Sequence, residues 1–276
     1  MIFARLTVAL LLCTLIVAEF GTPAAQACGA DSDCAVGERH YRIHLPPLAS
    51  DGRRIGAIVF AHGYKGSAVG TMRNKSLRRL ADRLGVALVA VKSAGDDWSI
   101  PGAPSLGAVE GVDELAYFDA VRADLLERFP VDPERMMVTG FSAGGMMVWT
   151  LACHRSGDYA GFAPLAGTFW RPIPVECEPP VASIIHIHGT ADKIVPLDGR
   201  VVQDGRQGSI HDVLAMYTAF GEFGAGKREP IGELVCEHRG SGEAVGLRFC
   251  TFAGGHSFKS DYLRQAWAMF VADGVL

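Results

Sequence analysis

The sequence predicts an α/β fold in which helices cover both faces of a mostly parallel central sheet. Short apolar runs of strand length recur along the chain, helical segments separate them, and no internal repeat or linker-like stretch interrupts the alternation. Strands that are apolar on both faces and alternate with helices are typical of parallel sheets buried between helical layers. The chain has 276 residues, 49% of them hydrophobic, which is enough for one large core.

The apolar runs give the expected strands in chain order: 57–61, 86–91, 136–139, 162–166, 183–187 and 247–252. Segment 40–45 alternates polar and apolar residues, as an antiparallel edge strand does. Helices are expected near 72–84, 109–129, 143–153, 211–223 and 259–273. The basic stretch 73–83 is read as the solvated face of the first helix, because its leucines recur at helical spacing.

The first 27 residues have the features of a secretory signal peptide. Arg5 supplies a positive charge, residues 6–18 form an apolar run, and Ala25-Gln-Ala27 fits the rule for cleavage after small residues. The run is shorter than the roughly 20 apolar residues that span a bilayer. We therefore expect 1–27 to be removed and 28–276 to be a single secreted domain, extracellular or periplasmic. A lipid on Cys28 is a less favoured alternative.

Six cysteines remain after that cleavage, and an even number in an oxidising compartment favours three disulfides. Sequence distance favours Cys28–Cys34 and Cys236–Cys250, and the second pair flanks 239–243, a glycine-rich segment where a hairpin turn is expected. Cys153–Cys177 then follows by elimination. Metal ligation is the alternative, but no C-x-x-C or H-x-x-x-H spacing supports it. No metal or organic cofactor is expected.

The stretch Gly140-Phe-Ser-Ala-Gly144 follows a buried strand and opens a helix. G-x-S-x-G in that context predicts a nucleophile elbow, a sharp turn that exposes the serine hydroxyl above the sheet. Glycines are needed on both sides because side chains there would collide with neighbouring backbone. Ser142 is therefore the candidate nucleophile. The Ala143 N–H lies at the helix N-terminus, where it can stabilise an oxyanion.

A serine nucleophile needs a histidine base and an acid that orients the histidine. Asp192 follows strand 183–187 and His256 follows strand 247–252, so both lie in loops at the carboxyl ends of strands. The chain order Ser, Asp, His is the one that this architecture uses. Asp96 and Asp97 precede the serine and are disfavoured as the acid. The Tyr64 N–H, after strand 57–61, is the expected second oxyanion donor.

Other candidates are less specific. Trp98, Trp170 and Ile194 are expected to line the substrate cleft, and for the two tryptophans hydrophobic packing is an equal alternative. His62 is expected to brace the oxyanion loop. His186 and His188 share one face of a strand and resemble a chelating pair, but no third ligand is in view, so packing is favoured.

Several stretches together resemble the secreted serine esterases related to polyhydroxybutyrate depolymerases and feruloyl esterases, which have the α/β-hydrolase fold. The stretches are 61–63 (AHG), 131–135 (VDPER), 138–146 (VTGFSAGGM), 163–167 (APLAG), 186–192 (HIHGTAD) and 254–256 (GGH). The resemblance spans about residues 38–272 and implies the same three roles for Ser142, Asp192 and His256. Two departures lie near the cleft. Tyr64 stands where relatives often carry cysteine, and Ser257-Phe-Lys259 replaces a common tryptophan and proline.

The resemblance implies a secreted carboxylic-ester hydrolase, acting through an acyl-enzyme on feruloyl-type aryl esters or hydroxyalkanoate oligomers. A polyhydroxybutyrate depolymerase-like polyesterase is one alternative, although no separate polymer-binding domain is in view. A peptidase or lipase of the same fold is another, and a secreted binding protein with an inactive triad is the non-enzyme alternative. The expected partner is a small ester or oligoester, and the protein is expected to be a monomer. A net charge of −4 predicts no nucleic-acid binding.

Overall fold

The computed structural model describes residues 28–47, 53–104, 106–240 and 245–276. The predicted signal peptide, 1–27, lies outside these ranges, as do residues 241–243 of the predicted glycine-rich turn. No helix within the described ranges is both long and apolar enough to cross a membrane.

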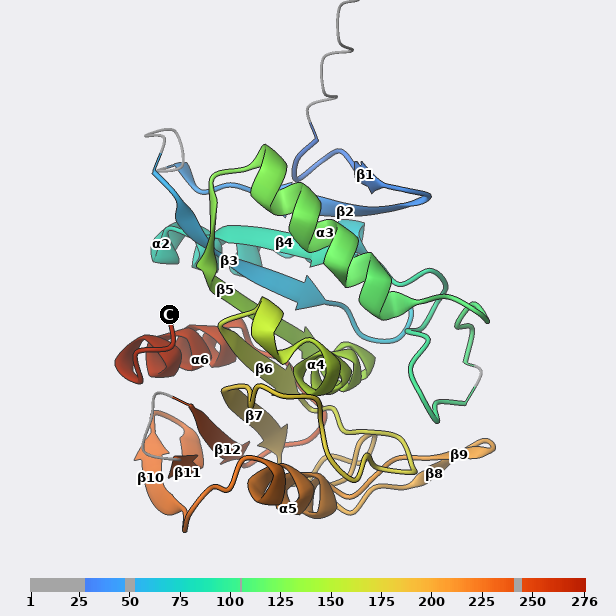
Figure 1. Ribbon diagram of the computed structural model, residues 1–276, viewed down its shortest axis with the longest axis vertical. Coiled ribbons are helices and arrows are strands. Elements are labelled where there is room, and N and C mark those ends of the chain that lie inside the picture. Colours follow the sequence, from blue (N-terminus) through green and yellow to red (C-terminus); the bar gives the residue numbers. More distant parts are fainter. Residues whose placement is uncertain (1–27, 48–52, 105, 241–244) are drawn as a thin grey trace, which may run out of the picture.

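A large mixed sheet forms the centre of the molecule (Figure 1). In chain order its strands are β1 (Cys34–Val36), β2 (Arg39–His44), β3 (Ile55–Ala61), β4 (Ala87–Val91), β5 (Val131–Phe141), β6 (Gly161–Leu165), β7 (Ile184–Gly189), β10 (Lys227–Ile231), β11 (Leu234–Gly240) and β12 (Gly246–Phe252). Their spatial order is β1-β2-β4-β3-β5-β6-β7-β12-β11-β10. In this order, the strands from β4 to β12 are parallel to one another. At each end of the sheet two further strands follow, each antiparallel to its inner neighbour.

The predicted parallel strands are all present, and the differences lie at the ends of the sheet. The segment predicted as an edge strand is β2, which is antiparallel but interior, because the short β1 pairs along its outer side. At the other end, β11 is antiparallel to β12, as the expected hairpin turn between them implies, and β10 adds a further antiparallel strand that the sequence did not indicate. A small second sheet, β8 (Val201–Val202) with β9 (Gly205–Arg206), was also missed.

Helices cover both faces of the sheet, as predicted (Figure 1). They are α1 (Ala68–Arg73), α2 (Lys75–Leu84), α3 (Glu114–Arg128), α4 (Ala143–His154), α5 (Ile210–Phe220) and α6 (Ser260–Ala272). Buried side chains of α3, α4 and α5 share one apolar cluster, and those of α1, α2 and α6 share a cluster on the opposite face. The single helix predicted near 72–84 is divided at Asn74, which caps α2.

Three disulfides join Cys28 to Cys34, Cys153 to Cys177 and Cys236 to Cys250, the pairs favoured from the sequence. The first ties β1 to the segment before it, and the third links directly opposed residues of β11 and β12. The second ties the last turn of α4 to the loop after β6. The carboxyl ends of the parallel strands meet at one edge of the sheet, the edge to which the β3 arrow points in Figure 1. The loops that carry the candidate catalytic residues start from this edge.

Candidate active site

Ser142 lies on a tight turn between β5 and α4. Its backbone has φ 59° and ψ −121°, a combination that non-glycine residues rarely adopt and that stores strain. A Cβ on Gly140 would lie 2.4 Å from the Gly144 carbonyl oxygen, and one on Gly144 would lie 2.0 Å from the Ala61 carbonyl oxygen. The turn therefore requires glycine at both positions, as the sequence predicts for a nucleophile elbow.

The structure brings His256 together with Asp192. Nδ1 of His256 donates to Oδ2 of Asp192 at 2.7 Å, which leaves Nε2 as the free acceptor nitrogen. The His256 ring packs against the Phe141 ring, with centroids 4.6 Å apart, and Phe141 directly precedes Ser142. The hydrogen bonds between described residues do not include one from the Ser142 hydroxyl to His256. Such a contact is often long in an unliganded site and shortens when substrate binds.

Asp192 is wholly buried but well supplied with donors. Besides His256, the backbone N–H groups of Ile194 and Val195 donate to its Oδ1 at 2.8 and 2.9 Å. Burial alone would raise the pKa of Asp192, but hydrogen bonds from His188, His256 and these two backbone groups outweigh the effect of burial. They hold the pKa of this carboxyl well below its usual range. Asp192 is therefore a stable anion that can orient an imidazolium.

Two backbone N–H groups beside the elbow have no acceptor among the described residues. A Cβ on Gly63 would be 3.5 Å from the Ser142 Cβ, so the loop after β3 passes directly next to the candidate nucleophile. Among the described residues, neither the Tyr64 nor the Ala143 N–H donates a hydrogen bond. Ala143 is the first residue of α4, where N–H groups have no intrahelical acceptor. Both groups are available to an oxygen bound at Ser142.

His62 braces this loop, in agreement with the structural role expected for it. Its Nδ1 donates to the Gly63 carbonyl at 2.8 Å and its Nε2 accepts the Ser93 N–H at 3.2 Å. Burial lowers the pKa of His62 to about 4, so the ring is neutral near pH 7. The Trp98 indole N–H donates to the His62 carbonyl at 2.8 Å. The loop is thus held through both the side chain and the backbone carbonyl of His62.

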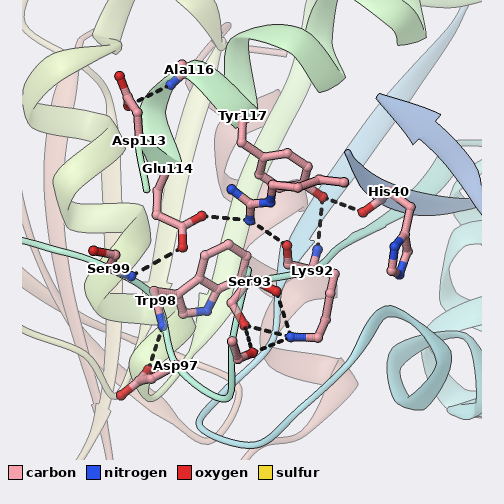
Figure 2. A network of polar contacts seen from close by, with 12 residues as sticks. His40, Lys92, Ser93, Asp97, Trp98, Ser99, Asp113, Glu114, Ala116 and Tyr117 are labelled. Carbon is pink, nitrogen blue, oxygen red and sulfur yellow. Dashed lines mark hydrogen bonds and ion pairs between the residues drawn. The ribbon is translucent and has the colours of Figure 1, made fainter. Parts of the chain in front are cut away.

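A polar network fastens the segment that supports His62 (Figure 2). The Lys92 ammonium donates to the Ser93 carbonyl at 2.7 Å, to the Ser93 hydroxyl at 2.9 Å, and to the Gly95 carbonyl. Arg39 donates to the Lys92 carbonyl at 2.6 Å and to the Glu114 carboxylate at 2.7 Å. Side chains from β2 and α3 thereby hold the loop after β4, which in turn holds His62.

Two aspartates of this loop are not placed as the acid. Asp97 is buried and accepts the Trp98 N–H at 2.8 Å (Figure 2), and the Asp96 carbonyl accepts the Lys65 N–H at 2.7 Å. No hydrogen bond or ion pair between described residues joins either carboxylate to His256. Asp192 is the carboxylate that meets the histidine.

The three residues expected to line the cleft have different surroundings. Trp98 is only 1% exposed and packs against His62 and Phe118 beneath the loop, and it also lines a cavity of about 150 Å³. Trp170 is also buried, but it lines a small cavity of about 80 Å³. Ile194 is 50% exposed beside Asp192, which leaves it accessible at the edge of the sheet that carries the candidate catalytic residues.

His186 and His188 are wholly buried and bonded to each other. The described residues include no group of three potential ligands that could hold a metal ion, so the chelating alternative finds no third ligand there. Hydrogen bonds also link the pair to the loop that carries Asp192, and the sequence did not predict this link.

A cavity of about 230 Å³ lies beside the elbow, and this feature was also missed. Three phenylalanine rings (Phe60, Phe141 and Phe258) form its apolar wall, and Gly63 and Asn74 also line it. Phe258 packs edge-on against Phe60, with centroids 5.6 Å apart, and lies 5.8 Å from Phe141. The sequence signal was the position of Phe258, two residues after His256. A cavity of about 710 Å³ between α5 and the β11–β12 pair contains none of the candidate catalytic residues.

Comparison with known proteins agrees with this fold. The chain superimposes on an acetyl xylan esterase from Aspergillus awamori with a TM-score of 0.58 at 12% identity, covering 84% of this chain and 94% of the other. It superimposes on esterase PE8 with a TM-score of 0.53 at 18% identity, covering 83% and 96%. The protein therefore has the α/β-hydrolase fold. At these identities the likeness concerns the fold alone.

The sequence is similar to esterases over shorter stretches. A family model described as phospholipase/carboxylesterase matches residues 115–204, which include Ser142 and Asp192. The chain is 34% identical over 166 residues to the putative esterase NocK of Nocardia uniformis subsp. tsuyamanensis, covering 58% of this chain and 47% of that protein. It is 32% identical over 89 residues to feruloyl esterase C of Emericella nidulans, covering 32% of each. The matches thus span half or less of these relatives.

Proposed function

We propose that the protein is a serine hydrolase of carboxylic esters, with Ser142 as nucleophile, His256 as base and Asp192 as the orienting acid. The observation that carries the proposal is the strained Ser142 elbow, whose Phe141 ring packs against a histidine that is hydrogen-bonded to a buried, ionised carboxylate. The similarity to esterases over the stretch that includes Ser142 and Asp192 supports the same reading.

In the proposed reaction, Nε2 of His256 takes the Ser142 proton as the hydroxyl oxygen attacks the ester carbonyl. The Tyr64 and Ala143 N–H groups donate to the negative oxygen of the tetrahedral intermediate. His256 returns the proton to the departing alcohol, which leaves the acyl group on Ser142. Water, activated by His256, then releases the carboxylic acid and restores the free serine. The buried Asp192 carboxylate stabilises the His256 imidazolium in each half of the cycle.

For the substrate we propose a small aryl ester of the feruloyl type, with a soluble hydroxyalkanoate oligomer as the second candidate. The cavity beside the elbow has a phenylalanine wall that suits a flat apolar group, and feruloyl esterase C is among the similar proteins. A polyhydroxybutyrate depolymerase-like activity rests on the resemblance of the motifs alone. We also propose that the protein is secreted after loss of residues 1–27, because disulfides form in oxidising compartments.

Initial hydrolysis rates on p-nitrophenyl butyrate, methyl ferulate and a soluble 3-hydroxybutyrate oligomer test this proposal. We expect the wild type and a control, Ser257→Ala, to be active and Ser142→Ala to be inactive on every ester. Ser257 is an exposed serine on the same edge of the molecule. Faster turnover of methyl ferulate than of the oligomer supports the aryl class, and the reverse order supports polyester fragments. Equal rates for wild type and Ser142→Ala would reject the mechanism.

A further inference from the structure

We propose that His188, supported by His186 and Trp149, is a positioning residue that holds the Asp192 loop in the geometry that His256 needs. The inference rests on the proposed function. It concerns a chain of buried side chains that crosses from α4 through β7 to the acid loop, and none of these side chains belongs to the three-residue catalytic set.

The chain of hydrogen bonds is continuous. The Trp149 indole N–H donates to Nδ1 of His186 at 3.1 Å. Nε2 of His186 and Nδ1 of His188 are 2.9 Å apart, and Nε2 of His188 lies 2.7 Å from the Val195 carbonyl oxygen. All three side chains are fully buried, so water does not compete for these bonds.

The chemistry of the two ends sets the direction of every bond. An indole N–H can only donate and a carbonyl oxygen can only accept. Nδ1 of His186 therefore carries no proton, and its Nε2 donates to Nδ1 of His188. The Nε2–H of His188 is then the donor to Val195. Burial is the main reason that the pKa of His186 lies well below its usual value, and the neighbouring His188 lowers it further, in keeping with a neutral ring.

The end of this chain reaches the loop that carries the acid. Val195 accepts from His188 through its carbonyl and donates to Asp192 Oδ1 through its N–H at 2.9 Å, so one residue joins the chain to the carboxylate. Nε2 of His188 is also 3.5 Å from Asp192 Oδ2, the oxygen that accepts from His256. The buried Gln207 side-chain amide also donates to the Ile194 carbonyl of this loop at 3.2 Å.

A purely structural role would leave a different signature. Two buried imidazoles are costly to desolvate, and an apolar pair of similar size would fill the same space without needing partners. If the pair only fills the core, its replacement changes stability and leaves the chemistry of correctly folded molecules unchanged. If it positions Asp192, replacement lowers kcat, because His256 is then misoriented in the transition state, while KM changes little.

Two substitutions separate these roles. His188→Leu removes the donor to Val195, whereas His188→Gln can place an amide N–H near the position of Nε2. Ile187→Ala is the matched control. Ile187 lies on the same strand but packs into the opposite core cluster, so its truncation destabilises β7 without removing any of the hydrogen bonds from Trp149 to Val195. Rates are measured on p-nitrophenyl butyrate below the unfolding temperature of every variant, and are normalised to active sites titrated with a serine-reactive phosphonate.

We expect His188→Leu to lose about a hundredfold in kcat with little change in KM, since a misplacement of about 1 Å has an effect of this order. His188→Gln should recover most of that loss, and Ile187→Ala should retain the wild-type kcat. The far-downfield proton resonance of His256 Nδ1–H should be present in wild type and His188→Gln and weakened in His188→Leu. If His188→Leu does not fold, His188→Asn, whose shorter amide cannot reach Val195, takes its place.

Wild-type kcat in a folded His188→Leu or His188→Asn variant would overturn the inference. A kcat of His188→Gln no higher than that of those variants would also overturn it. Either result differs from a failure of the proposed function. If only this inference fails, Ser142→Ala is inactive beside an active wild type. If the proposed function fails, Ser142→Ala itself retains wild-type activity.

Discussion

Two buried carboxylates near the candidate active site have opposite electrostatic surroundings. Asp192 accepts hydrogen bonds from His256 and two backbone N–H groups and remains ionised. Asp97 accepts from the Trp98 N–H (Figure 2). Burial, together with the nearby charges of Glu114 and Asp96, raises the pKa of Asp97 to about 6. The number of donors, rather than burial alone, decides whether the pKa of a buried carboxylate falls or rises.

Replacing Asp97 with asparagine should stabilise the protein at neutral pH. The pKa of Asp97 is raised on folding from its usual 3.8 to about 6, so keeping it charged in the native state disfavours folding. This cost is absent below about pH 4, grows as the pH rises through this interval, and is complete above about pH 6. Asp97→Asn keeps the acceptor for the Trp98 N–H. We expect a gain of up to roughly 3 kcal/mol in the free energy of unfolding at pH 7 and none at pH 3.5.

Urea denaturation at the two pH values measures this difference. Asp96→Asn, a substitution at the exposed neighbouring position, is the control and should change stability much less, because the Asp96 charge is the smallest cause of the raised Asp97 pKa. An Asp97→Asn variant no more stable than wild type at pH 7 would show that the folded protein carries the charge without penalty.

Among the secondary-structure elements, the junction of α1 and α2 shows how a single side chain sets a helix boundary. The Asn74 side-chain oxygen accepts the Ser76 and Leu77 N–H groups at 3.1 and 3.3 Å, and it also accepts the Ser76 hydroxyl at 2.7 Å. These bonds satisfy N–H groups that have no acceptor within α2. Asn74 also lines the cavity beside the elbow, so this cap contributes to the shape of the proposed substrate pocket.

Loss of this cap should be measurable without loss of the fold. Asn74→Ala is expected to lower the free energy of unfolding by about 1 kcal/mol, because it leaves buried or half-buried N–H groups unsatisfied. Asn74→Asp keeps an acceptor and adds a negative charge that the helix N-terminus favours, so it should stay close to wild type. Chemical denaturation compares the two. Equal stability of both variants would contradict the assigned role of the cap.

The elements that the sequence revealed share a strong local pattern. Each predicted parallel strand is an apolar run, and β3, β4, β6 and β7 are buried along their whole length. The strand β10 was missed because most of its residues are half or fully exposed and give no periodic signal. The division at Asn74 was missed because the hydrophobic spacing continues across it, although an asparagine before an amphipathic run is itself a start signal.

The same reasoning explains the candidate site. Ser142, Asp192 and His256 were predicted because each follows a recognisable strand in a required order. The phenylalanine cavity and the histidine chain form only when distant elements meet. Their members are ordinary core residues when each is read in its local sequence.

On the scale of the whole molecule, the disulfides are spread across the sheet. One lies at the β1 end, one joins the β11–β12 pair near the other end, and Cys153–Cys177 connects α4 to the loop after β6. A disulfide stabilises mainly by restricting the unfolded chain, and the effect grows with the length of chain it closes. The bonds should therefore contribute unequally.

Paired alanine substitutions test this expectation. Cys153–Cys177 closes 24 residues and Cys28–Cys34 closes 6, so removal of the first should lower the free energy of unfolding by about 3 kcal/mol and removal of the second by about 2. Calorimetry on the two double variants gives the order directly. A larger loss from removing Cys28–Cys34 would show that native contacts, not chain restriction, dominate.

The central claim is that Ser142 is an activated nucleophile, and labelling with a fluorophosphonate tests it most directly. The probe reacts when an activated serine oxygen displaces fluoride from phosphorus, and peptide mapping locates the adduct. We predict one adduct per wild-type molecule, at Ser142, no adduct in Ser142→Ala, and labelling slowed by orders of magnitude in His256→Ala. An unlabelled Ser142 in folded wild-type protein, or equal labelling of Ser142→Ala, would contradict the account.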